Sequence, residues 1–296
     1  MLSRKQMRRL IKSVYGAGNQ YGKELDKLYA RANRQIKGEI SAFLLSEQDW
    51  SGKPSKDDLE DVRTELEQAN DDSVSSLVAG LLAAITLGHP TNGDVETARL
   101  SLPLINVAKK RHQQMQQMQS KVPQDVNKIT HIQGQLTPEL HRVPLNYNTM
   151  FQRQVSDSVT SRGNNSININ RDIQQTMTRI RDIAKQASQS PKDDLNWSKM
   201  VDRALTGGKT HGGASGRAKM MIRTSACQEL NHATIADLRA RDVKKYRFMS
   251  LESINSCQEC TDLDGNVYDV EDAEEGVNLP PMHPNCQCWI VEFEDE

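Results

Sequence analysis

Aromatic side chains and long apolar runs are scarce in this chain of 296 residues. Aromatic residues make up 4% of the sequence and hydrophobic residues 36%, against 26% charged residues. This supply is thin for one large globular core, so we expect a mainly α molecule with an extended helical N-terminal region. The most apolar stretch, residues 74–87, is too short to span a bilayer and predicts a buried helix.

A secretory signal is also missing from the N-terminus. Residues 1–15 are basic, but they lack the continuous apolar core and the small-residue cleavage site of such a signal. We therefore expect the cysteines to be in a reducing compartment. There a tight cysteine cluster favours metal binding over disulfide formation.

Basic residues are absent from one end of the chain and concentrated at the other. Residues 251–296 contain thirteen Asp and Glu and no Lys or Arg, whereas residues 1–38 contain ten Lys and Arg against two acidic residues. The basic end suggests contact with a nucleic acid or an acidic protein surface. The alternative is a solvated helix face without a partner. The foremost basic residues of this arm are Arg4, Lys5, Arg8, Arg9 and Lys12.

Helical periodicity dominates the rest of the chain. Apolar residues from Leu25 to Leu44 recur mostly at steps of three and four. Further helices are predicted from about Ser55, over 74–87, from near Asp94, after residue 170 and over roughly 217–243. Prolines predict an irregular stretch over 120–148, and five glycines predict a flexible connector within 205–219.

Two short motifs do not support the chemistry that they first suggest. "GGKT" at 207–210 lacks the first glycine of a phosphate-binding loop, since Arg203 occupies that position. "DLDGNVYDVEDA" at 262–273 has its glycine at position 4 rather than 6 of a calcium loop, and it ends in Ala273. We interpret the second motif as an acidic turn around Asp264 and Gly265, with a small hairpin after it.

The last 40 residues hold four of the five cysteines. The spacing is C-x2-C, then 22 residues, then H-x2-C-x-C. Thiolates and imidazole are zinc ligands, and two such pairs can close a tetrahedron. The candidate metal ligands are four of these five residues: Cys257, Cys260, His283, Cys286 and Cys288.

We predict a structural zinc site, about one zinc per chain, that uses Cys257 and Cys260 with two of the other three candidates. Reduced, packed thiols or disulfides are one alternative, and a catalytic metal site is another. Catalysis needs an open coordination position and a placed base, and no H-x-E with P-C-x-x-C stands here. The fifth cysteine, Cys227, is interpreted as a buried small hydrophobic residue. The other six histidines are interpreted as structural or surface residues: His89, His112, His131, His141, His211 and His232.

The tail "CQECTDLDGNVYDV…PPMHPNCQCWI" resembles the C-terminal signature of the phage Mu F-like minor head proteins, also called the phage head morphogenesis or SPP1 minor-capsid family. The shared pattern is C-x2-C, an "LDG" turn, then P-x-H-P-x-C-x-C. Arg223 and Thr224 match the Arg-Thr of the family's upstream helix, but Ser225 stands in place of its glutamate, and Gln287 replaces the usual basic residue. The resemblance covers about 165–293.

This resemblance implies a virion component in the capsid interior at the portal vertex, made in the host cytoplasm. Its implied partners are the portal protein and a major capsid or scaffold protein, with DNA a further partner for the basic arm. Its implied roles are head assembly and DNA packaging or ejection. We expect no enzymatic activity. The alternative is a phage-encoded enzyme or toxin with a metal site in the C-terminal cluster, since some relatives carry toxin or nuclease domains.

The predicted organisation follows from these segments. Residues 1–150 form a helical, basic region that faces portal, capsid or DNA, and 151–205 form a further helical segment. Residues 206–219 are a Gly-rich connector. Residues 220–296 form a small α+β domain, which a cysteine and histidine knot closes because so short a segment cannot build a large core.

Overall fold

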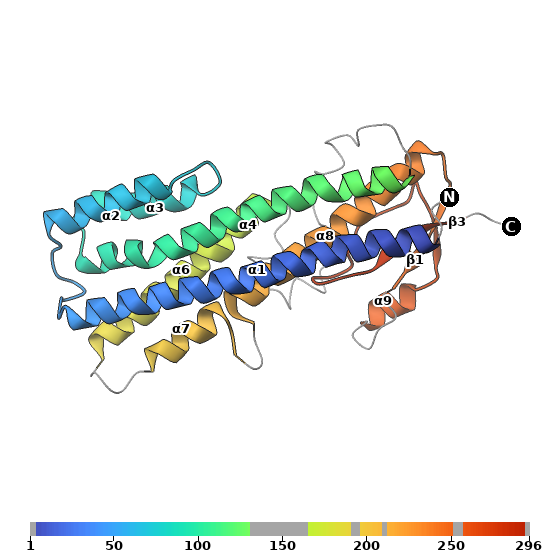
Figure 1. The fold of residues 1–296 in the computed structure, drawn as a ribbon. Helices are drawn as coiled ribbons and strands as arrows, with labels where there is room; N and C mark the ends of the chain where they lie inside the picture. The colour runs from blue at the N-terminus through green and yellow to red at the C-terminus, as the bar shows by residue number, and fades with distance from the viewer. Residues whose placement is uncertain (1–3, 131–164, 191–195, 209–211, 251–256, 294–296) are drawn as a thin grey trace. The chain divides into compact units, whose positions relative to one another are not determined.

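The computed structural model describes residues 4–130, 165–190, 196–208, 212–250 and 257–293. These residues are mainly helical, with a small sheet near the C-terminus, as the composition predicted (Figure 1). The described helices are α1 (Arg4–Leu45), α2 (Lys56–Ala69), α3 (Ser75–Thr86), α4 (Asn92–Thr130), α6 (Asn165–Gln189), α7 (Trp197–Leu205), α8 (Gly213–Ala240) and α9 (Gln258–Leu263). The strands are β1 (Lys245–Met249), β2 (Val267–Asp269) and β3 (Trp289–Phe293).

Helix α1 confirms the apolar periodicity of the N-terminal region. Leu25, Tyr29, Ile36 and Ile40 are each at most 1% exposed and lie on one face of the helix. The helix begins well before this apolar face, at Arg4. The basic arm is therefore the first part of α1, and the described side chain of Lys12 is exposed. The side chains of Arg4, Lys5, Arg8 and Arg9 lie outside the described part.

Helix α4 corrects the prediction of an irregular stretch over 120–148. The helix runs to Thr130 and passes through Pro123, while 131–148 lie outside the described residues. Proline removes one backbone hydrogen bond from a helix. Here the helix continues past the proline because side chains on one of its faces are buried before and after that position. They recur at steps of three and four: Met115, Met118, Val122 and Val126.

The predicted boundaries of the other helices are close to the observed ones. Ser55 is the N-cap of α2, and its side chain accepts a hydrogen bond from the Asp58 amide at 3.0 Å. Helix α6 begins at Asn165, earlier than expected. Helix α8 begins at Gly213, so part of the predicted glycine-rich connector is helical.

The described strands form an antiparallel sheet in the order β2-β1-β3. Tyr246 of β1 lies opposite Tyr268 and Glu292, and its ring is fully buried. The small hairpin expected after Gly265 is wrong, because the segment directly before the turn is α9 rather than a strand, and β2 pairs with β1 across a longer connection that contains α9. The turn itself exists: Gly265, at φ +80°, donates its N–H to the carbonyl of Phe248 at 2.9 Å.

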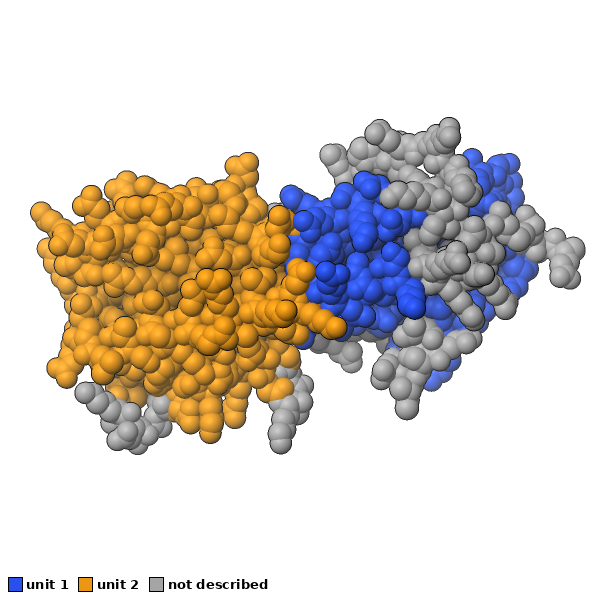
Figure 2. Space-filling view, in the orientation of Figure 1, with its two compact units in different colours: residues 1–22, 114–165, 219–296 blue, residues 23–113, 166–218 orange. Residues whose placement is uncertain are grey.

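The chain divides into two compact units (Figure 2). Unit 1 comprises residues 1–22, 114–165 and 219–296, and unit 2 comprises residues 23–113 and 166–218. Helices α1, α4 and α8 contribute residues to both units. The segmentation proposed from the sequence stays a prediction. Among the helices that the structure describes, none carries an apolar stretch long enough to cross a membrane.

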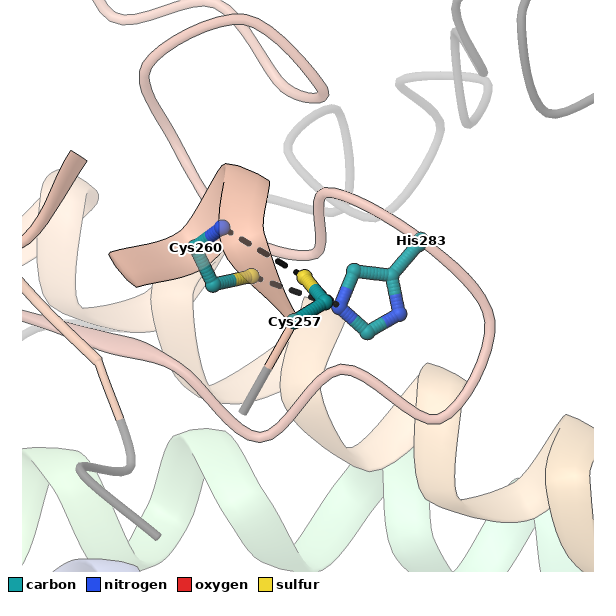
Figure 3. Close-up of side chains that lie close together, drawn as sticks. All are labelled: Cys257, Cys260 and His283. Atoms are coloured by element: carbon teal, nitrogen blue, oxygen red, sulfur yellow. Dashed lines mark hydrogen bonds between the residues drawn. The ribbon is translucent and has the colours of Figure 1, made fainter. Parts of the chain in front are cut away.

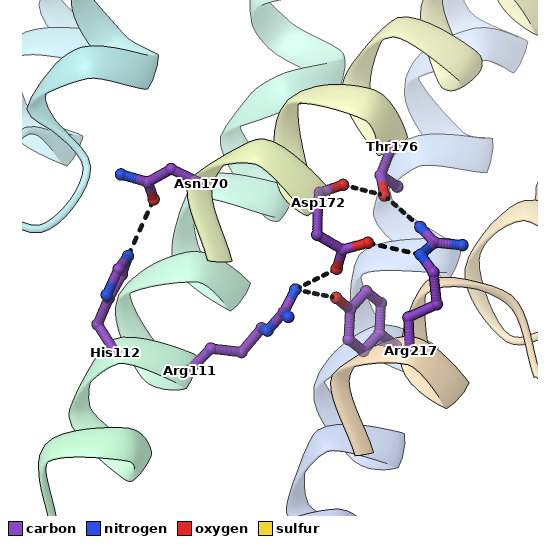
Figure 4. Close-up of polar contacts among 7 residues, drawn as sticks. Arg111, His112, Asn170, Asp172, Thr176 and Arg217 are labelled. Carbon is purple, nitrogen blue, oxygen red and sulfur yellow. Dashed lines mark hydrogen bonds and ion pairs between the residues drawn. The ribbon is translucent and has the colours of Figure 1, made fainter. Parts of the chain in front are cut away.

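Unit 2 has an ionic network at its centre (Figure 4). Asp172 of α6 is fully buried and accepts hydrogen bonds from Arg111 of α4 and Arg217 of α8, each at 2.5 Å. Arg111 also donates to the hydroxyl of Tyr29 on α1 at 3.2 Å. Arg217 donates to the hydroxyl of Thr176 at 3.0 Å. Four helices of unit 2 are thus joined through one carboxylate and its partners.

Candidate metal centre

Helix α9 positions the first two candidate ligands. Cys257 is the N-cap of this helix, and its sulfur accepts a hydrogen bond from the Cys260 amide at 3.4 Å. A C-x2-C pair around a helix start brings both sulfurs to the same side of the turn.

His283 lies against this pair (Figure 3). Its Nε2 is 3.2 Å from the Cys257 sulfur and 3.3 Å from the Cys260 sulfur. Its Nδ1 is 2.8 Å from the carbonyl oxygen of Pro284. With the proton on Nδ1, that nitrogen donates to the carbonyl and the Nε2 lone pair faces the two sulfurs. This arrangement of a ligating histidine with a carbonyl behind it is usual at metal sites.

Cys286 and Cys288 form a second group with Cys260. The three sulfurs lie within 4.8 Å of one another, and the three side chains are 1–3% exposed. The donor atoms of Cys257, Cys260 and His283 also lie within 4.8 Å of one another. The two groups therefore share Cys260, and each could hold a metal ion.

Helix α8 orients the segment that carries Cys286 and Cys288. The N–H of Asn285, a residue at φ +65°, donates to the hydroxyl of Thr224 at 2.9 Å. The Cys286 N–H donates to the carbonyl of His283 at 3.0 Å, which closes a tight turn between these two candidate ligands. Thr224 belongs to the Arg-Thr pair that the sequence singled out.

The carbonyl oxygen of Cys288 accepts three hydrogen bonds. The donors are the Asn231 amide at 3.1 Å, the Cys227 thiol at 3.4 Å and the Tyr15 hydroxyl at 3.4 Å. Asn231 and Cys227 come from α8, and Tyr15 comes from the part of α1 that belongs to unit 1. Elements far apart in the sequence thus hold the backbone of one candidate ligand.

Cys227 is closer to the cluster than the sequence suggested. It is fully buried, as predicted, but it packs in one hydrophobic cluster with Cys260, Cys286 and Cys288. No spacing motif joins it to the tail, because it lies on α8. Only the packing of α8 against the tail brings this thiol to the others.

The thiols perturb one another. Hydrogen bonds, first from Cys227 and then from Cys260 and Cys288, hold the pKa of the Cys286 thiol well below its usual value. The hydrogen bond to Cys286 is in turn the main cause that raises the pKa of Cys260. Negative charge therefore concentrates at Cys286, in a buried position where a metal cation would neutralise it.

The donors fit a thiophilic metal ion. The five residues that the spacing predicted form two groups of donors that share Cys260: the thiols of Cys260, Cys286 and Cys288 are buried, and Cys257 and His283 are half-buried. The choice of four ligands among these five stays a prediction. Among the described residues, no other group of Cys, His, Asp or Glu has the geometry to hold a metal ion.

The described histidines outside this centre have other partners or none. His112 Nε2 is 2.9 Å from the side-chain oxygen of Asn170 in unit 2 (Figure 4). His232 is buried on α8 in unit 1, and its Nε2 lies 2.5 Å from a carboxylate oxygen of Glu275. His89 is on the surface. The remaining ones, His131, His141 and His211, lie outside the described residues.

Residues 149–291 match the family model described as Phage Mu protein F like protein. These residues belong to the Mu F-like family. The matched segment contains every candidate ligand and confirms the resemblance read from the cysteine tail. Neither a curated protein nor a solved structure matches the chain.

Proposed function

We propose that the chain is a minor head protein that acts at the portal vertex during head assembly, inside the capsid. The family match over 149–291 carries this proposal. The proposed partners are the portal protein and a major capsid or scaffold protein, with a role in DNA packaging or ejection. The proposed role is structural and not enzymatic; the packing of the four candidate thiols in one hydrophobic cluster supports it.

Quantitative mass spectrometry of purified particles tests this role. We expect a few copies per particle, at or below the number of portal subunits, and co-purification with the portal protein. Absence from both mature particles and assembly intermediates would contradict a head protein. Presence in intermediates alone would instead identify an assembly factor that leaves before maturation.

We further propose that the cysteine and histidine cluster binds one structural zinc ion. Zinc prefers four sulfur and nitrogen ligands, and a closed site without a free position serves structure. Cys260, Cys286 and Cys288 are each at most 3% exposed, which suits a closed site. In a short tail with little core, the free energy of zinc binding would stabilise the fold directly.

Metal analysis of the purified full chain tests the zinc proposal. We expect about one zinc per chain. The double variant Cys257→Ser/Cys260→Ser should lose the metal and also lose thermal stability or solubility. Full occupancy in that variant would overturn the proposed ligand set. A metal-free variant that keeps its fold but loses an enzymatic activity present in the parent would instead support the alternative of a catalytic site.

The basic arm is proposed to contact DNA phosphates. Its side chains are Arg4, Lys5, Arg8, Arg9 and Lys12. Phosphate contacts release counterions, so the binding constant should fall steeply as salt increases. Removal of residues 1–12 should flatten this dependence. The same salt dependence with and without the arm would exclude it from DNA binding.

A further inference from the structure

The outer face of α1 in unit 2 carries an uninterrupted row of cations. Lys23, Lys27, Arg31 and Arg34 are all exposed. They follow one another at steps of four, four and three residues, which places them within about 80° around the helix axis. The buried residues Leu25, Tyr29 and Ile36 occupy roughly the opposite side. We name this row the basic stripe.

The charges of the basic stripe are not paired with any acidic side chain in the described part of the chain. None of its four side chains forms an ion pair or side-chain hydrogen bond with any residue that the structure describes. By contrast, Lys37 on the same helix binds Asp202 at 2.6 Å. Two acidic side chains lie near the stripe on the same helix. Asp26 accepts a hydrogen bond from Ser215, and Glu24 is half-buried.

We propose that the basic stripe binds the phosphate backbone of double-stranded DNA. The row extends for about 16 Å along the helix, so its cations can meet several phosphates at once. Repulsion among four unpaired cations is a cost to the free protein that an extended polyanion removes. The stripe lies within the basic segment 1–38 and is made of other residues than Arg4, Lys5, Arg8, Arg9 and Lys12, so it deepens the DNA part of the proposed function.

The composition of the face selects this partner over others. The large exposed hydrophobic side chains of the described residues all lie elsewhere: Leu45, Leu87, Val267 and Val277. Protein interfaces rely on buried aromatic or aliphatic anchors, and single-stranded nucleic acid needs aromatic platforms for its bases. The stripe has neither. It offers charge alone, which binds a duplex without regard to base sequence.

A matched pair of variants of the full chain tests the proposal. The stripe variant is Lys23→Gln/Lys27→Gln/Arg31→Gln/Arg34→Gln, in which glutamine keeps the helix propensity. The control changes the net charge equally at exposed positions of unit 2 that also have no ion pair to any described residue: Lys53→Gln/Lys56→Gln/Arg179→Gln/Lys185→Gln. Binding to a random-sequence DNA duplex is measured over a range of salt concentrations, with circular dichroism to verify folding.

The expected result is a change in the salt dependence of the stripe variant. The slope of log K against log salt should become shallower by about 3 to 4 if four phosphate contacts are lost. The control should change the slope by much less. An unchanged slope in the stripe variant, or an equal change in both variants, would overturn the proposal.

Loss of a capsid or portal partner with DNA binding retained would also overturn it and identify an acidic protein surface as the ligand. Copy number in particles and portal binding are measured separately. A negative DNA result would therefore leave the proposed head role untouched, and absence from particles would leave the DNA result valid.

Discussion

Cys227 packs against the candidate metal ligands, and its contacts indicate a supporting role. Its sulfur lies 3.4 Å from the Cys288 carbonyl oxygen, where a thiol donates a hydrogen bond but a thiolate would be repelled. Burial is the main cause that raises its pKa well above the usual value. Both observations favour a protonated thiol that supports the ligands from behind.

The variant Cys227→Ala should therefore keep the metal. We expect unchanged zinc stoichiometry and a loss of about 1–2 kcal/mol in the free energy of unfolding, from the small cavity and the missing hydrogen bond. Metal analysis and urea unfolding measure the two effects. Cys260→Ala, at a residue shared by both ligand groups, is the control that should lose the metal. Loss of metal from Cys227→Ala would make this residue a ligand.

Glu96 makes the stability of unit 2 depend on pH. Its side chain is 3% exposed, and its Oε1 has no hydrogen-bond partner among the described residues. Burial and then the charge of Glu39 raise its pKa from 4.5 to about 7. Because the folded-state pKa is above the unfolded one, protonation stabilises the fold. This contribution is complete below about pH 4.5 and is lost as the pH rises through about 7.

We expect Glu96→Gln to remove much of this dependence. The variant should be more stable than the parent at pH 8, by up to about 3 kcal/mol, and the difference should shrink towards pH 4.5. Urea unfolding at several pH values measures this. Glu60→Gln, at an exposed position of α2, should leave the pH profile unchanged. A parent whose stability rises between pH 5 and 8 more than that of Glu96→Gln would contradict the prediction.

At the scale of helices, Asp172 joins α6 to its neighbours in unit 2. Its carboxylate binds two guanidinium groups, and the side chain of Arg111 is itself only 3% exposed. The removal of one partner of a buried pair leaves the other charge without compensation. This network therefore joins four helices through one carboxylate, and we expect their packing to depend on it.

Asp172→Asn should destabilise the protein strongly. We expect a loss of about 3–5 kcal/mol in the free energy of unfolding, since the buried charge of Arg111 would lose its carboxylate partner. Asp182→Asn is the matched control on the same helix. Its partner Arg181 is exposed, so its loss should cost under about 1 kcal/mol. Similar urea midpoints for the two variants would show that the buried network does not hold the helices together.

For the whole molecule, metal removal should affect the two units differently. Every candidate ligand belongs to unit 1. If zinc binding contributes folding free energy, a chelator should increase amide hydrogen exchange in α9 and in the sheet. Helices α2, α3 and α7, which belong to unit 2, should keep their protection. Zinc added back should restore the protection of α9 and the sheet. An equal increase of hydrogen exchange in both units on chelation would contradict a local structural role.

Much of the helical fold was predictable because local periodicity carries it. The apolar face of α1 and the Ser55 cap of α2 involve residues within a turn or two of one another. The continuation of α4 through Pro123 was not predictable in this way. The hydrogen bond that a proline removes from a helix can be foreseen from the sequence. The buried contacts that outweigh this loss come from other parts of the fold, so they cannot.

The sequence by itself determined the types of candidate ligand, the C-x2-C and H-x2-C-x-C spacings, and the resemblance of the tail to the Mu F-like family. These properties are local, since each motif brings its donors together within a few residues. Only the tertiary structure decided that the two motifs share Cys260, that Cys227 and Tyr15 join them, and that Asp172 lies between two arginines. Such contacts join residues that are distant along the chain, and only the packing of whole elements brings them together.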